Sequence, residues 1–260
     1  MSSLRIQILG SGTSAGVPMI GCHCAVCEST DPRDKRSRCS IAVHYDNTSI
    51  LVDTTPELRL QACAARLDRI DAVVFTHAHA DHIFGLDDVR RYNTIMNAPL
   101  PIYATAETLM VLQTAYSYAF TPAEKVPGAL YRPELVPTII GDEPFTIGSR
   151  KWQPVPLIHG RAKVLGFRIG DFAYCTDCSA IVPSSLALLQ NLDVLIIDAL
   201  RPRPHPTHLS FDQALQMIET LQPRRAFFTH LSHDLKHADI EATLPPHIRV
   251  LYDGLVIETV

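Results

Sequence analysis

Short apolar runs separated by turn residues recur along the whole chain. They are rich in β-branched and aromatic residues, which is typical of β-strands. The sequence therefore predicts strands over residues 4–9, 40–45, 49–52, 72–75, 151–158, 164–169, 172–176, 194–198, 226–229 and 248–251.

Longer segments with helical spacing lie between these runs. The predicted helices span residues 56–69, 86–96, 106–119 and 211–221, and the first has Pro56 in its first turn with Thr54 or Thr55 as its N-cap. Both halves of the chain alternate strands with helices. This order predicts an α/β fold in which two sheets pack face to face with helices outside.

The composition fits one large domain. With 260 residues, 47% of them hydrophobic and 19% charged, the chain is long enough for a sizeable core, so we expect a single domain over residues 1–260. A net charge of -4 argues against a general nucleic-acid coat or a polybasic membrane patch.

The amino terminus and the cysteine content bear on location. Residues 1–10 alternate like a strand and have no signal-peptide pattern, and no apolar segment approaches the roughly 18 residues of a membrane span. The odd count of 7 cysteines favours a reducing compartment. We therefore expect a cytoplasmic protein without membrane contact.

A dense cluster of potential metal ligands follows the strand predicted over 72–75. His77, His79, Asp81 and His82 lie within six positions. Imidazole and carboxylate groups suit a cation such as Zn²⁺ or Mn²⁺. The cluster therefore predicts a metalloenzyme.

Three further polar residues stand where an apolar run stops: His159, Asp177 and His230. Together with the first cluster they give seven ligands, which suit two metal ions about 3.5 Å apart with Asp177 between them. Such a pair generates a bridging hydroxide near neutral pH and can bind phosphoryl oxygens. This predicts a hydrolase for phosphate esters.

The pattern His-x-His-x-Asp-His, followed by later strand-end His, Asp and His, resembles the metallo-β-lactamase superfamily. The resemblance implies an αββα four-layer sandwich with a binuclear site at the edge of the two sheets. Asp53 matches an early aspartate of that superfamily that supports the metal loop. Asp81 in the cluster and Asp177, where many lactamases have cysteine, make the chain similar to the phosphodiesterase branches.

The loop containing Cys22, Cys24 and Cys27 predicts a second metal site. Close thiolates favour tetrahedral Zn²⁺, and His233 is a candidate for the fourth ligand. With the segments 10–18, 76–85, 176–177 and 229–233, this loop resembles the phosphoribosyl 1,2-cyclic phosphate phosphodiesterases of the carbon-phosphorus lyase (phosphonate) pathway. That family binds a structural zinc at the matching residues, which implies a zinc-binding loop around residues 21–39 here.

The other cysteines have a plainer interpretation. Cys175 and Cys178 flank Asp177 in a C-x-x-C spacing that could indicate a redox pair or another zinc, but we interpret both as small core residues. Cys39 and Cys63 receive the same core interpretation.

An alkoxide leaving a phosphodiester needs a proton, which predicts a general acid. His208 is the candidate, with His205 as its rival, and Asp81 is expected to act catalytically as well as bind metal. For the rest of the substrate, Arg161, Lys163 and the glycine-rich turn 10–16 are candidates, although such a turn can equally be a tight connection.

The leading hypothesis is therefore hydrolysis of a small cyclic phosphodiester, such as phosphoribosyl 1,2-cyclic phosphate or a cyclic nucleotide. The alternatives are a tRNA 3′-end endonuclease and a noncatalytic carrier that resembles the pyrroloquinoline quinone assembly protein. The endonuclease branch inserts a tRNA-gripping arm between the residues matching His159 and Asp177, an interval of only 18 residues here. The family resemblance also implies a homodimer.

Overall fold

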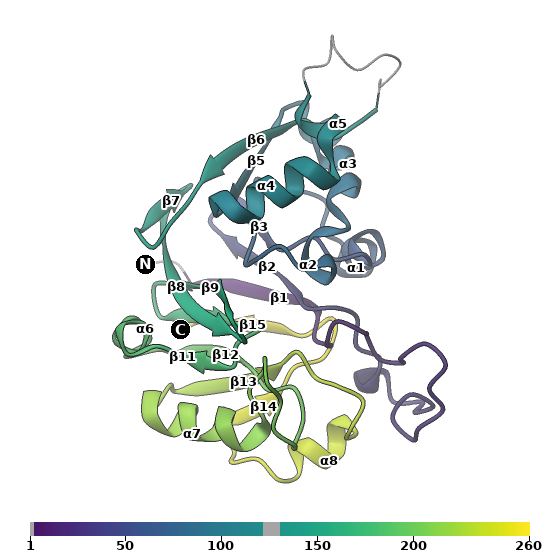
Figure 1. Cartoon of the computed structure of the whole chain (residues 1–260), viewed down its shortest axis with the longest axis vertical. Helices are drawn as coiled ribbons and strands as arrows, with labels where there is room; N and C mark the ends of the chain where they lie inside the picture. The colour runs from purple at the N-terminus through teal and green to yellow at the C-terminus, as the bar shows by residue number, and fades with distance from the viewer. Residues whose placement is uncertain (1–2, 122–130) are drawn as a thin grey trace.

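The computed structural model describes residues 3–121 and 131–260, so the domain predicted over 1–260 includes two short segments outside the described residues. Two mixed β-sheets face each other, with helices on their outer sides (Figure 1). This confirms the expected αββα arrangement.

The first sheet combines an antiparallel and a parallel half. β15, β1, β2 and β3 pair antiparallel, whereas β3, β4, β5 and β6 pair parallel. In spatial order the strands are β15 (Val256–Glu258), β1 (Arg5–Gly10), β2 (Ser40–Tyr45), β3 (Thr48–Val52), β4 (Ala72–Val74), β5 (Leu100–Ala104) and β6 (Leu135–Ile139).

The second sheet is built in the same way. β11, β8, β9 and β10 pair antiparallel, and β10, β12, β13 and β14 pair parallel. The strands are, in order, β11 (Ala180–Ile181), β8 (Arg150–His159), β9 (Ala162–Ile169), β10 (Phe172–Cys175), β12 (Val194–Asp198), β13 (Arg225–Thr229) and β14 (Ile248–Val250), while β7 (Phe145–Ile147) pairs with β8.

Helices cover the outer face of each sheet (Figure 1). The first carries α1 (Leu58–Ala65), α2 (Ala80–Ile83), α3 (Arg90–Met96), α4 (Ala106–Ala115) and α5 (Ser117–Phe120); the second carries α6 (Pro183–Leu188), α7 (Phe211–Leu221) and α8 (His237–Glu241). Two 3₁₀ turns, Pro32–Asp34 and Leu86–Val89, complete the described elements. None of the described helices is long and apolar enough to cross a membrane.

Strands buried on both faces explain why the apolar runs are continuous. In β12, Val194 and Ile196 pack between the sheets, whereas Leu195 and Ile197 pack toward the outer helices. A strand covered on both sides has no polar face, so its sequence does not alternate. All the strands predicted from these runs are present, within two residues at each end.

Three of the predicted helices differ from the structure, one in its extent and two in their continuity. The helix predicted over 56–69 spans only Leu58–Ala65, because Arg66 adopts a left-handed conformation that ends it. Thr54 and Thr55 are not its N-cap, since the Thr54 amide donates to the His82 carbonyl and the Thr55 hydroxyl donates to Gln61.

The helix predicted over 86–96 begins with a 3₁₀ turn before α3, and that over 106–119 breaks at Tyr116 into α4 and α5. The helix predicted over 211–221 matches α7, whose capping box of Ser210 and Gln213 defines its start.

Candidate metal and catalytic site

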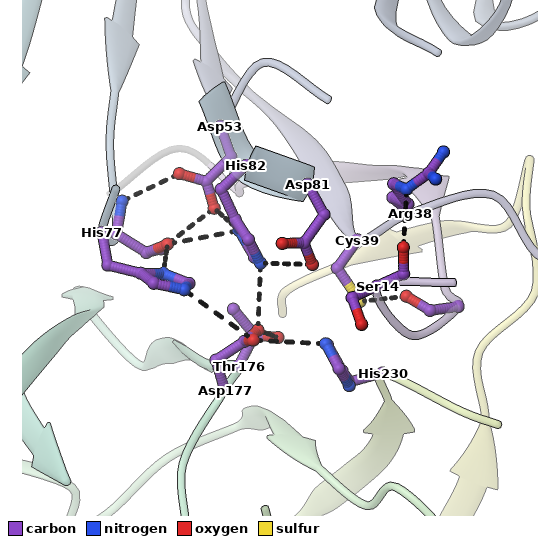
Figure 2. Close-up of polar contacts among 12 residues, drawn as sticks. Ser14, Arg38, Cys39, Asp53, His77, Asp81, His82, Thr176, Asp177 and His230 are labelled. Atoms are coloured by element: carbon purple, nitrogen blue, oxygen red, sulfur yellow. Dashed lines mark hydrogen bonds and ion pairs between the residues drawn. The ribbon is translucent and has the colours of Figure 1, made fainter. Parts of the chain in front are cut away.

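The predicted ligands meet at one edge of the two sheets, where strands end. His77 follows β4, and His79 precedes α2, which places Asp81 in the first turn of a short helix. On the second sheet, Asp177 follows β10 and His230 follows β13. These two strands run parallel on either side of β12, so their carboxyl ends share one edge. Asp177 and His230 meet there (Figure 2).

Three histidines form the first ligand group. The ligand atoms of His77, His79 and His159 lie within 4.8 Å of one another. His159 is the last residue of β8, in the opposite sheet from His77. Packing of the two sheets therefore completes this group.

All four residues of the second group are buried. Ligand atoms of Asp81, His82, Asp177 and His230 also lie within 4.8 Å of one another. His82 Nε2 is 3.3 Å from both Asp81 Oδ2 and Asp177 Oδ1 (Figure 2). His230 Nε2 is 3.2 Å from Asp177 Oδ2.

Asp177 connects the two groups. The same oxygen that faces His230 lies 3.9 Å from His77 Nε2, and Asp177 also belongs to a cluster with His159. A carboxylate in this position can contact two cations at once.

Buried partners fix the orientation of the histidines. The Asp53 carboxylate accepts from His82 Nδ1 at 2.7 Å (Figure 2). It also accepts from the Thr76 amide and hydroxyl at 2.8 Å. His159 Nδ1 donates to the Thr207 carbonyl at 2.7 Å. Because each Nδ1 is engaged, Nε2 of both rings is directed to the site. The predicted supporting role of Asp53 is confirmed.

Three residues of the site have strained backbones. Asp53, Asp177 and His230 have φ values of 64°, 54° and 61°. Residues with a Cβ seldom adopt this left-handed region, and such strain concentrates at functional sites. The surrounding hydrogen bonds and packing hold these side chains in place.

The charges in the second group depend on each other. Burial disfavours the charged form of His82, but the carboxylates of Asp177 and Asp53 outweigh it and raise its pKa well above the usual value. His230 behaves similarly beside Asp177, and its pKa rises to about 9. Burial opposes ionisation of Asp177 too, yet His230 and His82 hold its pKa well below the usual value.

The residues fit a bound cation. Nε2 of His77, His82 and His230 is buried. Each atom lies 3.2–3.9 Å from an oxygen of Asp177, but among the described residues none of them has a partner in hydrogen-bond geometry. Buried polar atoms are normally satisfied, so three such atoms aimed at buried carboxylates indicate a ligand set. Imidazole and carboxylate donors suit divalent cations such as Zn²⁺ and Mn²⁺.

His208 lies against this site. Its ring stacks on that of His230, with centroids 4.3 Å apart, and its Nδ1 donates to Asp198 Oδ2 at 2.7 Å. His205 is farther out: its ring centroid is 5.3 Å from that of His208, and it joins none of the ligand clusters of the described residues. The geometry favours His208 over His205.

Asp198 is the residue that the sequence analysis missed. It is the last residue of β12 and is completely buried. The rule that found Asp177, a polar residue where an apolar run stops, applies to Asp198 as well. Its partner is ten positions away, and only the fold shows that the two meet.

The cysteine loop meets the chain just after His230. Sγ of Cys22, Cys24 and Cys27 lies 3.3, 3.4 and 3.5 Å from His233 Nδ1. A tetrahedral zinc with ordinary bond lengths has sulfur–nitrogen separations of about 3.5 Å. The amide of Cys27 lowers the pKa of Cys24 to about 6, whereas burial raises that of Cys27 to about 11. The predicted fourth donor therefore lies at zinc-site spacing.

The glycine-rich turn is a tight connection. The amides of Gly12, Thr13 and Gly16 donate to protein carbonyls, and a Cβ at Gly12 would lie 2.6 Å from the Arg36 carbonyl oxygen. Arg161 and Lys163 are both exposed, and Lys163 lines a cavity beside His77.

The predicted core positions of the remaining cysteines are confirmed with one exception. Cys39, Cys175 and Cys178 are buried, whereas Cys63 is exposed. Cys63 is two residues beyond the buried Gln61 on α1, which puts it on the solvent side of that helix.

The chain resembles known proteins over most of its length. The model of the beta-lactamase superfamily domain matches residues 48–231. An octanoyltransferase of Porphyromonas gingivalis is 38% identical over 257 residues, which cover 97% of this chain but 51% of that protein, so the chain spans about half the length of this relative.

Two solved structures share the fold. A diphosphatase from the PhnP family is 42% identical, with a TM-score of 0.92 and coverage of 99% of this chain and 97% of that chain. Zinc-bound PqqB from Methylobacterium extorquens has a TM-score of 0.79 at 20% identity, with 97% of this chain and 99% of that chain covered. At that identity, the second likeness concerns the fold alone.

Proposed function

Because the chain belongs to the metallo-β-lactamase superfamily, we propose that it is a binuclear metal-dependent phosphodiesterase for small diesters, such as phosphoribosyl 1,2-cyclic phosphate or a cyclic nucleotide. One observation carries the proposal. Asp177 lies between two groups of candidate ligands, and the buried Nε2 atoms of His77, His82 and His230 face its carboxylate at 3.2–3.9 Å. Two ions at such a site lower the pKa of water and stabilise charge on phosphoryl oxygens.

The residues divide into two ligand sets. His77, His79 and His159 would hold one ion, Asp81, His82 and His230 the other, and Asp177 would contact both. Asp53 keeps His82 in the ligand tautomer through its 2.7 Å hydrogen bond. Binding of a cation would displace the protons that the carboxylates now stabilise on His82 and His230.

His208 would supply the proton to the leaving alkoxide. Asp198 accepts from Nδ1, which leaves Nε2 as the atom that gives the proton. A buried carboxylate in this position fixes the orientation of the ring. Asp81 would act through the ion that it binds.

The cysteine loop would hold a structural zinc through Cys22, Cys24, Cys27 and His233. Arg36 ties the same regions together, because its guanidinium is completely buried and donates to the carbonyls of Ser232 and Leu235. The loop would thereby stabilise the segment that follows His230.

A small substrate agrees with the topology. The interval between His159 and Asp177 is filled by β9 and β10, which leaves no residues for a tRNA-gripping arm. The relative with 42% identity is named a diphosphatase, and a diphosphatase cleaves a phosphorus-oxygen bond. Three expectations stay predictions: a single domain over residues 1–260, a cytoplasmic location and a homodimer. Light scattering would test the homodimer.

The test is metal-stimulated hydrolysis of a ribose cyclic phosphate, 2′,3′-cyclic nucleotides, bis(p-nitrophenyl) phosphate and a tRNA precursor. We expect turnover of small diesters with the tRNA uncut, and strong loss in His77→Ala. Cleavage of tRNA alone would favour the endonuclease. Metal analysis distinguishes a noncatalytic carrier from an enzyme. A carrier would hold only the cysteine-loop zinc and would hydrolyse none of these substrates.

A further inference from the structure

A cavity of about 680 Å³ opens beside the first ligand group. His77 and His79 form part of its wall, so the cavity is continuous with the proposed metal site. Its other walls come from the start of α4, the end of β6, and β8 and β9. The cavity therefore lies between the two halves of the molecule.

Large aliphatic side chains contribute much of the lining of this cavity. Ile140, Val164 and Leu165 are buried, and Val111 and Ile139 are 42% and 65% exposed. The charged lining residues Glu107, Asp142 and Lys163 are exposed and can stay hydrated at the mouth. Large exposed aliphatic side chains beside a recess are typical of a surface that a ligand covers.

The lining favours an alkyl group over a nucleobase. The described residues around the cavity include no Phe, Tyr or Trp, so a nucleobase would find no aromatic stacking partner apart from the two histidines. An alkyl group would exchange water for contact with five aliphatic side chains: Val111, Ile139, Ile140, Val164 and Leu165. Burial of apolar area is favourable in proportion to that area.

We infer that this cavity is a subsite for an aliphatic group attached to the phosphorus centre. The inference rests on the proposed function, because it takes the phosphoryl oxygens to be held at the His/Asp ligand groups. From there, a chain that passes His77 and His79 enters the cavity directly. The preferred substrate class is then a phosphodiester with an alkyl substituent.

Binding of n-alkylphosphonates to the Mn²⁺-loaded protein tests the subsite without turnover. Calorimetric titration with methyl-, butyl- and hexylphosphonate should show affinity rising with chain length, on the order of tenfold or more from methyl to hexyl. In the variant Val111→Thr/Ile139→Thr this gain should fall to a few-fold, because polar groups replace two aliphatic contacts. Thr keeps the branched shape of both residues.

Val136→Thr is the matched control. Val136 is an exposed residue of β6, 49% exposed, that does not line the cavity. This variant should keep the full dependence on chain length. A series of equal affinities in the wild type, or an undiminished gain in the double variant, would overturn the subsite.

The two proposals can fail separately. Turnover of small diesters together with equal phosphonate affinities contradicts the subsite and supports the phosphodiesterase. A steep chain-length dependence without turnover of any diester supports the subsite and contradicts the phosphodiesterase.

Discussion

Replacing His208 by alanine should slow cleavage most where the leaving group is poor. A ribose alkoxide is a strong base and needs a proton as it leaves, whereas p-nitrophenolate leaves readily without one. His208 is positioned for this role, because its ring stacks on His230 with centroids 4.3 Å apart. The variant should therefore lose activity on a cyclic nucleotide and retain most of it on bis(p-nitrophenyl) phosphate.

The expected size of the loss in His208→Ala follows from the usual contribution of a general acid. General acid catalysis contributes roughly 10²–10⁴-fold, or about 3–5 kcal/mol of transition-state stabilisation, which bounds the loss in His208→Ala. Asp198→Asn should lose less. Asp198 Oδ2 accepts from both His208 Nδ1 and the Cys178 amide, so an amide oxygen can take both hydrogen bonds.

What Asp198→Asn removes is the negative charge. Hydrogen bonds to charged groups exceed those to neutral groups by about 1–2 kcal/mol, so kcat should fall about 5- to 30-fold. Again the loss should be larger for the cyclic nucleotide.

Steady-state kinetics on the two substrates, with fully loaded metal sites, measure the effect. His205→Ala is the control, since His205 lies outside the ligand clusters formed by the described residues. Thermal denaturation of each variant shows whether it is folded. Equal losses on both substrates, or an equal loss in His205→Ala, would refute the assignment of His208 as the general acid.

Three further predictions concern stability and metal content. Arg36→Met should lower the free energy of unfolding by about 3–5 kcal/mol, because it leaves the buried Asp34 carboxylate without the Arg36 guanidinium. Denaturant unfolding measures this loss, and a value under about 1 kcal/mol would contradict the prediction. Cys27→Ser should lower the metal content by one equivalent and leave the other two, as measured by elemental mass spectrometry; unchanged content would contradict the zinc site. Burial opposes ionisation of Asp193, but hydrogen bonds from Arg224 and Arg225 lower its pKa. Its stabilising effect is therefore present above the unfolded pKa of about 3.9 and is lost as the pH falls through the lower folded value, so Asp193→Asn should destabilise the protein at pH 7 and have little effect in strong acid. Unfolding curves across that range check the sign.

Local sequence predicted the strands well because burial on both faces leaves a continuous apolar run. β12 is an example, apolar until its last residue, and β13 is another, apolar between its first and last residues. β5 and β6 were not predicted, since each contains a proline that weakens the strand signal. β15 forms at the sheet edge by pairing with β1, a contact nearly 250 residues away in the chain. Edge pairing of this kind leaves almost no local pattern.

The candidate ligand residues could be identified from the sequence alone. His77, His79, Asp81 and His82 are adjacent in the chain, and one turn after a strand is enough to place them together. Their chemistry and spacing predict a metal site without any knowledge of the fold.

The tertiary structure decided which distant groups complete that site. His159 and Asp177 reach His77 only because the second sheet packs against the first, and Asp198 reaches His208 through the end of β12. The cavity beside His77 likewise needs α4 and β9 from opposite halves of the chain. Local sequence encodes backbone conformation and side-chain chemistry, but the distance between remote residues depends on how the whole core packs. The candidate ligands were therefore visible in the sequence, whereas the pairing of Asp198 with His208 and the shape of the cavity beside His77 were not.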